Sequence, residues 1–308
     1  LPGFLVSSVI TGRLVRSFIA AQNVANSPDV QPPPRFAALM SDRLSALIPA
    51  GRHVLIAGPT ASGKSALALG IARLADAAGA AIHERAEVVA VVHGTATTPT
   101  VVQTRRGRVL CDQLILAANG YLGDLEPKVA ARVMPINNFI VATEPLGPRA
   151  AEVLTRPIGV HDTKFVVNYW RLDPEGRLIF GGGENVSYRF PADIFAKVRK
   201  PLLQIYPTLA DVKLTHAWGG TLAITMNRMP HFARPAPNCL SAGGYSGHGV
   251  AMATLGGKLM ADAVAGQSDG FDAMAAIPSR PFPGGSMLRS PLLVAGMAWY
   301  GLRDWLGF

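Results

Sequence analysis

The chain has 308 residues, of which 49% are hydrophobic and 16% are charged, and it contains 32 glycines. This composition excludes a disordered chain or a coiled coil and favours a compact α/β protein of one or two domains. The formal net charge of +9 is compatible with an anionic partner. However, the densest basic group, Arg105, Arg106 and Arg108, surrounds a glycine in a predicted turn, so we expect no nucleic-acid partner.

The ends of the chain and its cysteines give weaker indications. Proline, asparagine and aspartate are frequent in residues 24–36, which read as a linker. The opening run LPGFLVSSVITGRLVRSFIAA is interrupted by Arg13 and Arg16, so we expect neither a signal peptide nor a membrane span. The two cysteines, Cys111 and Cys239, lie far apart in apolar runs, which indicates buried free thiols in a reducing, cytoplasmic compartment.

The first predicted elements are short. Residues 53–57 predict a buried strand and residues 65–78 predict a helix that Gly79 ends. Short strands follow at roughly 81–93, 100–104 and 108–118, and the sequence RRG predicts the turn between the last two.

Longer elements follow. The segments INNFIVATEP, KFVVNYWRL and RLIFGGG predict antiparallel strands, and DPEG at 173–176 predicts the turn between the last two. An amphipathic helix is predicted over 191–206. Residues 250–266 are apolar almost all round and predict a buried helix. The tail, 290–308, predicts a helix packed on the body, with contact to a membrane surface as the alternative.

This order predicts an α/β (α+β) fold in which a nucleotide-binding layer is interrupted by an antiparallel substrate-binding sheet. The predicted segments are 1–50, an N-terminal extension and linker; 51–80, a strand, glycine loop and helix; 81–123 with 229–270, the nucleotide-binding layer; 124–228, the substrate sheet; and 271–308, a C-terminal tail helix.

Residues 58–65, GPTASGKS, match the phosphate-binding pattern G-x-x-x-x-G-K-[ST] between a predicted strand and helix. Glycines there let consecutive N–H groups converge on a phosphate, Lys64 adds a positive charge, and Ser65 can hold Mg²⁺. The stretch from residue 53 to about residue 72 resembles the start of tRNA dimethylallyltransferases. The resemblance implies a site for ATP with Mg²⁺, or for a prenyl diphosphate, formed by Gly58, Thr60, Gly63, Lys64 and Ser65.

The same family follows its first helix with an Asp-containing segment that supplies a catalytic base, whereas this chain reads AAIHERAEVVAVV there. No later apolar strand ends in an aspartate that would hold the metal ion. We therefore interpret the glycine loop as an inherited stub of another gene. An ATP-binding, tRNA-modifying transferase stays the alternative function, and we expect no other metal site.

A second glycine-rich turn, GGYSGHG at 243–249, lies between a predicted strand and helix. Glycines at such a turn let the backbone approach a flat or anionic ligand, and the helix N-terminus offers N–H donors. With WGGTLAITMNRMPHFAR at 218–234 and LILAANGYLG at 114–123, this turn resembles the FAD-dependent oxidoreductases of D-amino-acid-oxidase type, most closely the gamma-glutamylputrescine oxidase branch. The resemblance runs from about residue 68 to residue 308 and includes MPINNFIVATEPLG, DPEGRLIFGGG and TLADVKLTHAWGG.

The resemblance implies that the layer is a partial FAD/NAD(P)-binding Rossmann-like layer, that FAD is the cofactor and that a small amine carrying a carboxylate is the substrate. His248, Tyr169 and Trp218 are the implied catalytic-site residues; a satisfied buried histidine stays the alternative for His248, and a core role stays the alternative for the two aromatic residues. The implied cofactor contacts are Val88 at the adenine end; Ala117, Asn119 and Gly120 where a strand closes over the dinucleotide; Trp218, Gly219 and Gly220 at the isoalloxazine; and Gly244, Ser246, Gly247, His248 and Gly249 at its N1/O2 side.

This family also begins with a strand, G-x-G-x-x-G and a helix, which seat the FAD diphosphate. Upstream of the matching region, GPTASGKS is the only glycine-rich turn. The chain thus looks like the C-terminal portion of an amine oxidase behind a prenyltransferase-like start, and we expect it to hold FAD weakly or not at all. Two alternatives remain: the strand, loop and helix over 53–78 accept the diphosphate through Lys64, or the chain is a non-catalytic remnant of a gene fusion. The sequence gives no indication of the oligomeric state.

Overall fold

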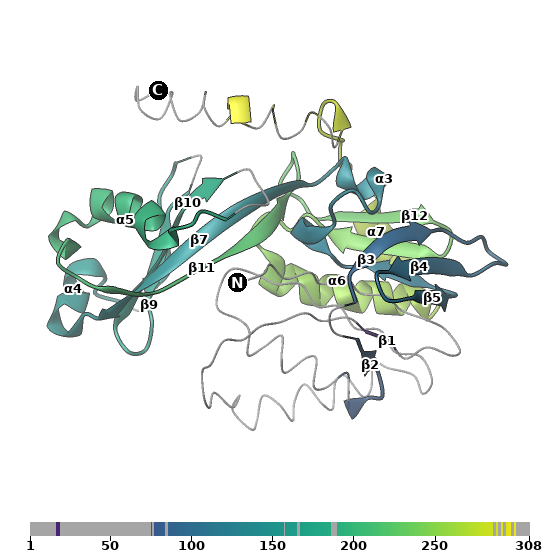
Figure 1. Ribbon diagram of the computed structural model, residues 1–308, viewed down its shortest axis with the longest axis horizontal. Coiled ribbons are helices and arrows are strands. Elements are labelled where there is room, and N and C mark those ends of the chain that lie inside the picture. Colours follow the sequence, from purple (N-terminus) through teal and green to yellow (C-terminus); the bar gives the residue numbers. More distant parts are fainter. Residues whose placement is uncertain are drawn as a thin grey trace. The chain divides into compact units, whose positions relative to one another are not determined.

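The computed structural model describes residues 86–285 except 157, 165–166 and 186–189, together with 75, 77–83 and a few positions nearer the two ends. The chain divides into two compact units, which are described separately (Figure 1). Unit 1 consists of Leu1–Met134 and Ala223–Ser286, and unit 2 of Pro135–Leu222 and Met287–Phe308. The elements are a mixture of helices and of parallel and antiparallel strands, which confirms the predicted α/β (α+β) class.

Unit 1 contains a three-stranded sheet in the order β12-β13-β6. Strand β13 (Cys239–Gly243) pairs in parallel with β6 (Leu114–Leu116) and antiparallel with β12 (His231–Ala236). Every residue of β6 and β13 is buried, as expected for a parallel pair covered on both faces. Helices α6 (Gly249–Val264) and α7 (Asp269–Ala275) share one hydrophobic cluster with the sheet, built around Phe232, Leu240, Met260 and Phe271.

A second sheet of unit 1 is the antiparallel meander β3-β4-β5, formed by Val88–Val92, Thr100–Thr104 and Arg108–Cys111. The prediction of one strand over 108–118 is wrong, because the chain bends at Asp112 and Gln113. The first half stays in the meander, whereas the second half, β6, joins the other sheet after the Leu114 N–H donates to the Asn238 carbonyl.

The predicted strand over 81–93 is likewise divided, into β2 (Ala81–Ile82) and β3. Strand β2 pairs in parallel with β1 (Ser17–Phe18). Two short helices follow β6: η1 (Asn119–Tyr121) and α3 (Pro127–Ala130). The buried Glu126 carboxylate begins α3, because it accepts from the Lys128 N–H at 3.1 Å and lies 2.5 Å from Nε2 of His93.

Unit 2 is built on a five-stranded sheet in the order β11-β7-β10-β9-β8. Its long strands are β7 (Met134–Pro145), β10 (Arg177–Asn185) and β11 (Leu214–Ile224), with β8 (Val160–His161) and β9 (Tyr169–Leu172) at one edge. Strand β10 is antiparallel to β7 and β9, which confirms the predicted antiparallel strands. The predicted DPEG turn is also present: the Asp173 carbonyl accepts from the Gly176 N–H, and Gly176 has φ +75°.

Helices of unit 2 are α4 (Ala150–Val153) and α5 (Ile194–Ile205), with the short turns η2 (Gly147–Arg149) and η3 (Pro207–Leu209). Helix α5 begins where Oδ1 of Asp193 accepts from the Ala196 N–H at 2.9 Å, so it is slightly shorter than the predicted 191–206. Its buried residues Val198 and Leu202 pack with Phe139 and Phe180 in the core of the unit.

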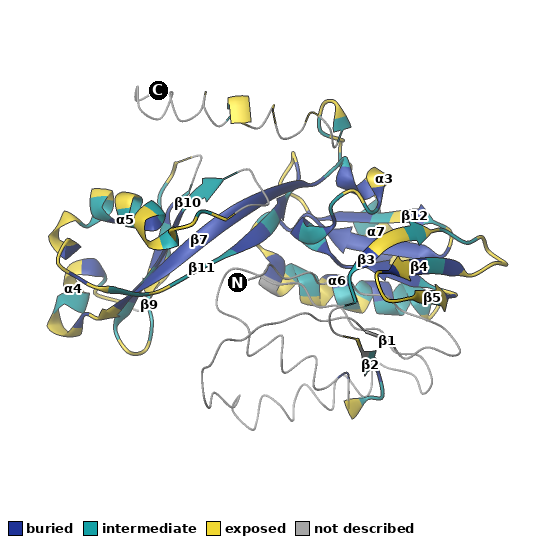
Figure 2. Cartoon of the chain, viewed as in Figure 1, coloured by how far each residue is buried: buried dark blue, intermediate teal, exposed yellow. Residues whose placement is uncertain are grey.

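Helix α6 differs from the sequence prediction. The apolar composition of 250–266 predicted a buried helix, but exposed and intermediate positions run along its length (Figure 2). Only one face, with Gly256 and Met260 buried, packs on the sheet, and Leu255 is exposed. Seven of the 16 residues of this helix are alanine or glycine, whose small apolar surfaces can face solvent at little cost. Among the described residues, no helix is long and apolar enough to cross a membrane.

Both cysteines are free and buried, which confirms the prediction from the sequence. They belong to one cluster with residues of the β3-β4-β5 meander and of the β12-β13-β6 sheet, among them Val88, Val102 and Leu114. Burial, with a smaller effect of Asp112, raises the pKa of the Cys111 thiol to about 12. Burial likewise raises the pKa of Cys239 well above its ordinary value.

Glycine 181 allows the Tyr169 ring to lie flat on β10, since a β-carbon at Gly181 would be 2.2 Å from Cζ of that ring. We expect Gly181→Ala to lower the free energy of unfolding by about 1–3 kcal/mol, because the ring must leave its position. Gly107→Ala is the control, since its β-carbon meets no atom within 4 Å; it should leave stability unchanged or raise it by about 0.5 kcal/mol. Urea unfolding measures both, and equal effects would contradict the contact.

Candidate flavin-binding loop and substrate-sheet cluster

The loop between β13 and α6 contains five predicted cofactor residues, 244 and 246–249. Its backbone takes left-handed conformations at Gly244 (φ +65°), Ser246 (φ +50°) and Gly247 (φ +96°). The Ser246 N–H donates to the Ala223 carbonyl at 2.9 Å, and its Oγ donates to the Gly244 carbonyl at 3.1 Å. These bonds fold the loop back on itself just before the first turn of α6.

Asn119 connects this loop to the end of β6. Its side-chain Oδ1 accepts a hydrogen bond from the Gly244 N–H at 3.0 Å, and its own backbone is left-handed at φ +47°. Ala117 and Gly120, on either side of it, are both buried. The structure therefore brings together the predicted closing-strand residues and the glycine loop, at the edge where the parallel strands β6 and β13 end.

Thr225 holds the other side of the loop, and the sequence analysis did not single it out. Its N–H donates to Oγ of Ser246 at 3.3 Å, and its Oγ1 donates to the Met229 carbonyl at 2.7 Å. A β-carbon at Gly244 would lie 2.5 Å from Cγ2 of Thr225, so only glycine fits there. The only signal in the sequence was a threonine directly after the run WGGTLAI.

The outer end of the loop is open. A β-carbon at Gly247 would have no protein atom within 4 Å, and His248, the residue before α6, is exposed. The interpretation of His248 as a buried histidine is therefore wrong. Gly249, the first residue of α6, is buried. An exposed glycine, an exposed imidazole and a helix start beside one another fit the ring end of a flavin, which offers a flat face and accepting oxygens.

The remaining cofactor residues lie elsewhere. Val88 is buried at the first position of β3, in unit 1. Trp218, Gly219 and Gly220 lie on β11, in unit 2, with Gly220 buried. The alternative phosphate site, formed by Gly58, Thr60, Gly63, Lys64 and Ser65, lies outside the described residues. The strand, loop and helix predicted around it also lie outside them, up to residue 74.

Tyr169 belongs to a polar cluster on the sheet of unit 2. Its hydroxyl donates to Oδ1 of Asn138 on β7, and Nδ2 of Asn138 donates to Oε1 of Glu184 on β10 at 3.2 Å. Burial, with a smaller effect of the Glu184 charge, raises the pKa of Tyr169 far above its ordinary value, so the phenol stays protonated. By contrast, Trp170 stacks on Phe180 in the core, with ring centroids 5.8 Å apart.

A second set of polar contacts is formed by the buried Asn137. Its Oδ1 accepts from Oγ1 of Thr221 at 2.8 Å, and its Nδ2 donates to Oδ1 of Asn185 at 3.1 Å. Polar side chains thus connect four neighbouring strands, β11, β7, β10 and β9, and of these residues only Tyr169 was predicted from the sequence. The usable signal was the pair of asparagines in INNFIVATEP, two amides inside an otherwise apolar strand.

Comparison with known proteins gives one consistent result. The family described as FAD dependent oxidoreductase (DAO) matches residues 24–263, a range that starts upstream of the predicted resemblance. The chain is 42% identical over 238 residues to the probable oxidoreductase OrdL of Rhizobium meliloti (77% of this chain, 55% of the relative). It is 39% identical over 243 residues to the gamma-glutamylputrescine oxidoreductase of Escherichia coli (78% and 56%). The chain thus spans about half the length of these curated relatives.

Solved structures agree in fold. Glycine oxidase from Geobacillus kaustophilus matches with a TM-score of 0.54 at 19% identity, over 66% of this chain and 54% of that chain. L-proline dehydrogenase from P. horikoshii matches with a TM-score of 0.54 at 21% identity, over 68% and 59%. At these identities the likeness concerns the fold alone.

The bond between Asn119 and Gly244 can be tested without a cofactor. Asn119→Gly keeps the left-handed backbone but removes the acceptor, so we expect hydrogen exchange at the Gly244 amide to become about tenfold faster. Asn119→Asp keeps an acceptor oxygen and should stay within about twofold of the parent. Hydrogen exchange followed by NMR measures both. Unchanged protection in Asn119→Gly would show that the loop is held by other contacts.

Proposed function

The chain belongs to the family of FAD dependent oxidoreductases described as DAO, and from this premise we propose that it forms the ring-binding and substrate-binding parts of an FAD-dependent amine oxidase. The observation that carries the proposal is the loop 243–249, which Asn119 and Thr225 hold from two sides while Gly247 and His248 stay exposed. When bound, FAD would accept a hydride from the carbon next to a neutral amine and pass the electrons to oxygen, forming peroxide.

The loop residues have separate tasks in this proposal. Gly247, which lacks a side chain, lets the backbone approach the flavin ring. The first turn of α6 and the exposed His248 imidazole offer donors to the N1/O2 side, where negative charge develops on reduction. Asn119 holds the Gly244 N–H, so the loop keeps its shape whether or not the cofactor is present.

Unit 2 supplies the substrate groups. The protonated Tyr169 hydroxyl and the Asn138 amide donate hydrogen bonds, and the half-buried Glu184 carboxylate can accept from an N–H of the substrate amine. This mixture of donors and one carboxylate suits a primary or secondary amine that also carries a carboxylate. The name of the Escherichia coli relative, gamma-glutamylputrescine oxidoreductase, supports the same class. The two free buried thiols are consistent with a cytoplasmic location.

Binding of FAD is the first test. Because this chain spans about half the length of its curated relatives and its glycine-rich turn GPTASGKS departs from the pattern G-x-G-x-x-G, we expect the protein purified as this chain to bind FAD weakly. Loss of two or three charged hydrogen bonds corresponds to several orders of magnitude in affinity, roughly 1–3 kcal/mol each. Absorbance spectra with and without added FAD measure this. A yellow protein with near-stoichiometric flavin would contradict it, and Lys64→Ala would then test the glycine loop as the diphosphate site.

Two loop variants test the proposed ring contact by the same titration. Gly247→Ala places a side chain where the ring should approach and strains a backbone at φ +96°. We expect it to weaken FAD binding about tenfold or more. His248→Ala removes one exposed hydrogen bond and should cost about two- to tenfold. The opposite order would place the flavin away from Gly247.

Titration with ATP and Mg²⁺ tests the alternative: heat that Lys64→Ala abolishes would favour the nucleotide-binding function.

Peroxide release tests the substrate class. With gamma-glutamylputrescine, sarcosine and D-amino acids as candidate substrates, we expect Tyr169→Phe to lower kcat/KM about tenfold, because it removes the hydroxyl at the substrate cluster. Tyr206→Phe is the matched control, since its hydroxyl donates to the Val153 carbonyl elsewhere in unit 2; it should change kcat/KM by less than about twofold. No peroxide from any of these amines, in protein that holds flavin, would refute the substrate class.

A further inference from the structure

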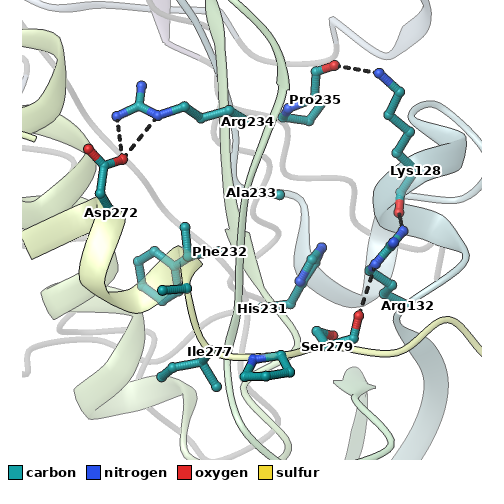
Figure 3. A pocket seen from close by; sticks show the side chains of 13 residues that line it. Lys128, Arg132, His231, Phe232, Ala233, Arg234, Pro235, Asp272, Ile277 and Ser279 are labelled. Carbon is teal, nitrogen blue, oxygen red and sulfur yellow. Dashed lines mark hydrogen bonds and ion pairs between the residues drawn. The ribbon is translucent and has the colours of Figure 1, made fainter.

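A pocket of about 480 Å³ lies along β12 in unit 1, and none of the predicted cofactor residues lines it (Figure 3). Its walls are formed by His231–Pro235 on β12, by α3 and the turn after it, and by α7 and the segment that continues to Ser279. Among the described strands, β12 is at the edge of its sheet, so its residues reach the pocket from both faces.

The two sides of β12 differ in charge. In Figure 3 Arg234 and Asp272 lie on one side, and His231, Lys128, Arg132 and Ser279 lie on the other. On the first side the charges cancel, because the Arg234 guanidinium donates to Oδ1 of Asp272 at 2.9 Å. The second side is called the His231 side below.

The cations of the His231 side are held by neutral groups. Nζ of Lys128 donates to the Pro235 carbonyl at 2.8 Å. The Arg132 guanidinium donates to the Lys128 carbonyl at 2.7 Å and to the Ser279 carbonyl at 3.1 Å. In the part of the chain that the structure describes, no carboxylate forms an ion pair with either residue. Two positive charges are therefore fixed in position without an ion-pair partner among the described residues.

Two buried polar atoms on the same side have no hydrogen-bond partner among the described residues: Nε2 of His231 and Oγ of Ser279. His231 is only 7% exposed, and a buried polar atom without a partner is costly. Burial and the neighbouring Arg132 lower the pKa of His231 to about 4, so the imidazole is neutral near pH 7. It can then donate a hydrogen bond without adding a third charge.

These groups specify the ligand. Lysine and arginine only donate, and the imidazole and the hydroxyl can donate too, so the ligand must be rich in acceptor oxygens. Two cations without an ion-pair partner match a group that carries between one and two negative charges near neutral pH, as a phosphate does. We propose that the His231 side of this pocket binds a phosphate group, free or as the monoester of a small molecule, through Arg132, Lys128, His231 and Ser279.

The site is next to the loop 243–249 without being part of it. His231 pairs with Gly243 across the strands, and a β-carbon at Gly244 would lie 3.6 Å from Cβ of His231. A bound phosphate should therefore shift the NMR signal of the Gly244 amide. It should also raise the pKa of His231, since an anion opposes the effect of Arg132.

Calorimetric titration of the full chain with inorganic phosphate and with glycerol 3-phosphate tests the proposal, at neutral pH and with ionic strength held constant by sodium chloride. Tighter binding of the ester would identify a small-molecule monoester as the ligand, and equal or tighter binding of phosphate would identify the free ion. Either result supports the site, provided that the variants below respond. Absence of heat and of NMR shifts with both probes would overturn it.

Variants locate the site. Arg132→Gln should weaken phosphate binding about 20-fold or more, and Ser279→Ala, a smaller change that tests the site even if Arg132→Gln fails to fold, about fivefold. Arg106→Gln removes the same charge in the turn before β5, and Arg234→Gln removes it on the neutral side of β12. Both should stay within about twofold. Equal losses in the three arginine variants, with no loss in Ser279→Ala, would mean that phosphate responds only to net charge, which would overturn the proposal.

Discussion

The hydrogen bond from the Gly244 N–H to the Asn119 side chain is the interaction on which the candidate site in unit 1 depends. It joins the ends of the parallel strands β6 and β13, at the point where both segments of the chain turn away from the sheet. Both residues are in the left-handed region, which glycine and asparagine tolerate better than other residues. The pairing of β6 with β13 and the contact of Thr225 with Ser246 hold the same region. The Asn119 amide adds a direct link between two segments that are far apart in the sequence.

Much of the fold follows from local signals. The turn DPEG fixes β9 and β10 because an aspartate and a glycine occupy the positions that such a turn requires. The division between β5 and β6 did not follow, because RVLCDQLIL reads as one apolar run and only tertiary pairing separates its halves. The burial of α6 was overestimated for a related reason: composition does not tell which face of a helix meets the sheet.

The site residues likewise include some that could be predicted from local sequence and some that could not. Glycines such as Gly244 and Gly247 could be found from the sequence, because a glycine cluster at a strand-to-helix turn indicates a left-handed backbone or a close approach to a ligand. The contact between Glu184 and Asn138 could not, because it depends on the register between β10 and β7, where the chain carries an irregularity between Gly182 and Asn185. The role proposed for His231 could not be predicted from the sequence either, because it depends on Arg132 and Ser279, which come from other parts of the chain.

The two buried thiols have a consequence for the chemistry proposed for this chain. Peroxide reacts with thiolates, whereas burial keeps Cys111 and Cys239 protonated and out of contact with solvent. Oxidative damage would therefore fall first on exposed thioethers. Met226 and Met229, 52% and 44% exposed, are in the turn between β11 and β12, and the Met229 carbonyl accepts from Thr225. Sulfoxide formation there would alter the segment that supports the glycine loop. In the described part of the chain, peroxide would therefore oxidise Met226 and Met229 before it oxidised Cys111 or Cys239.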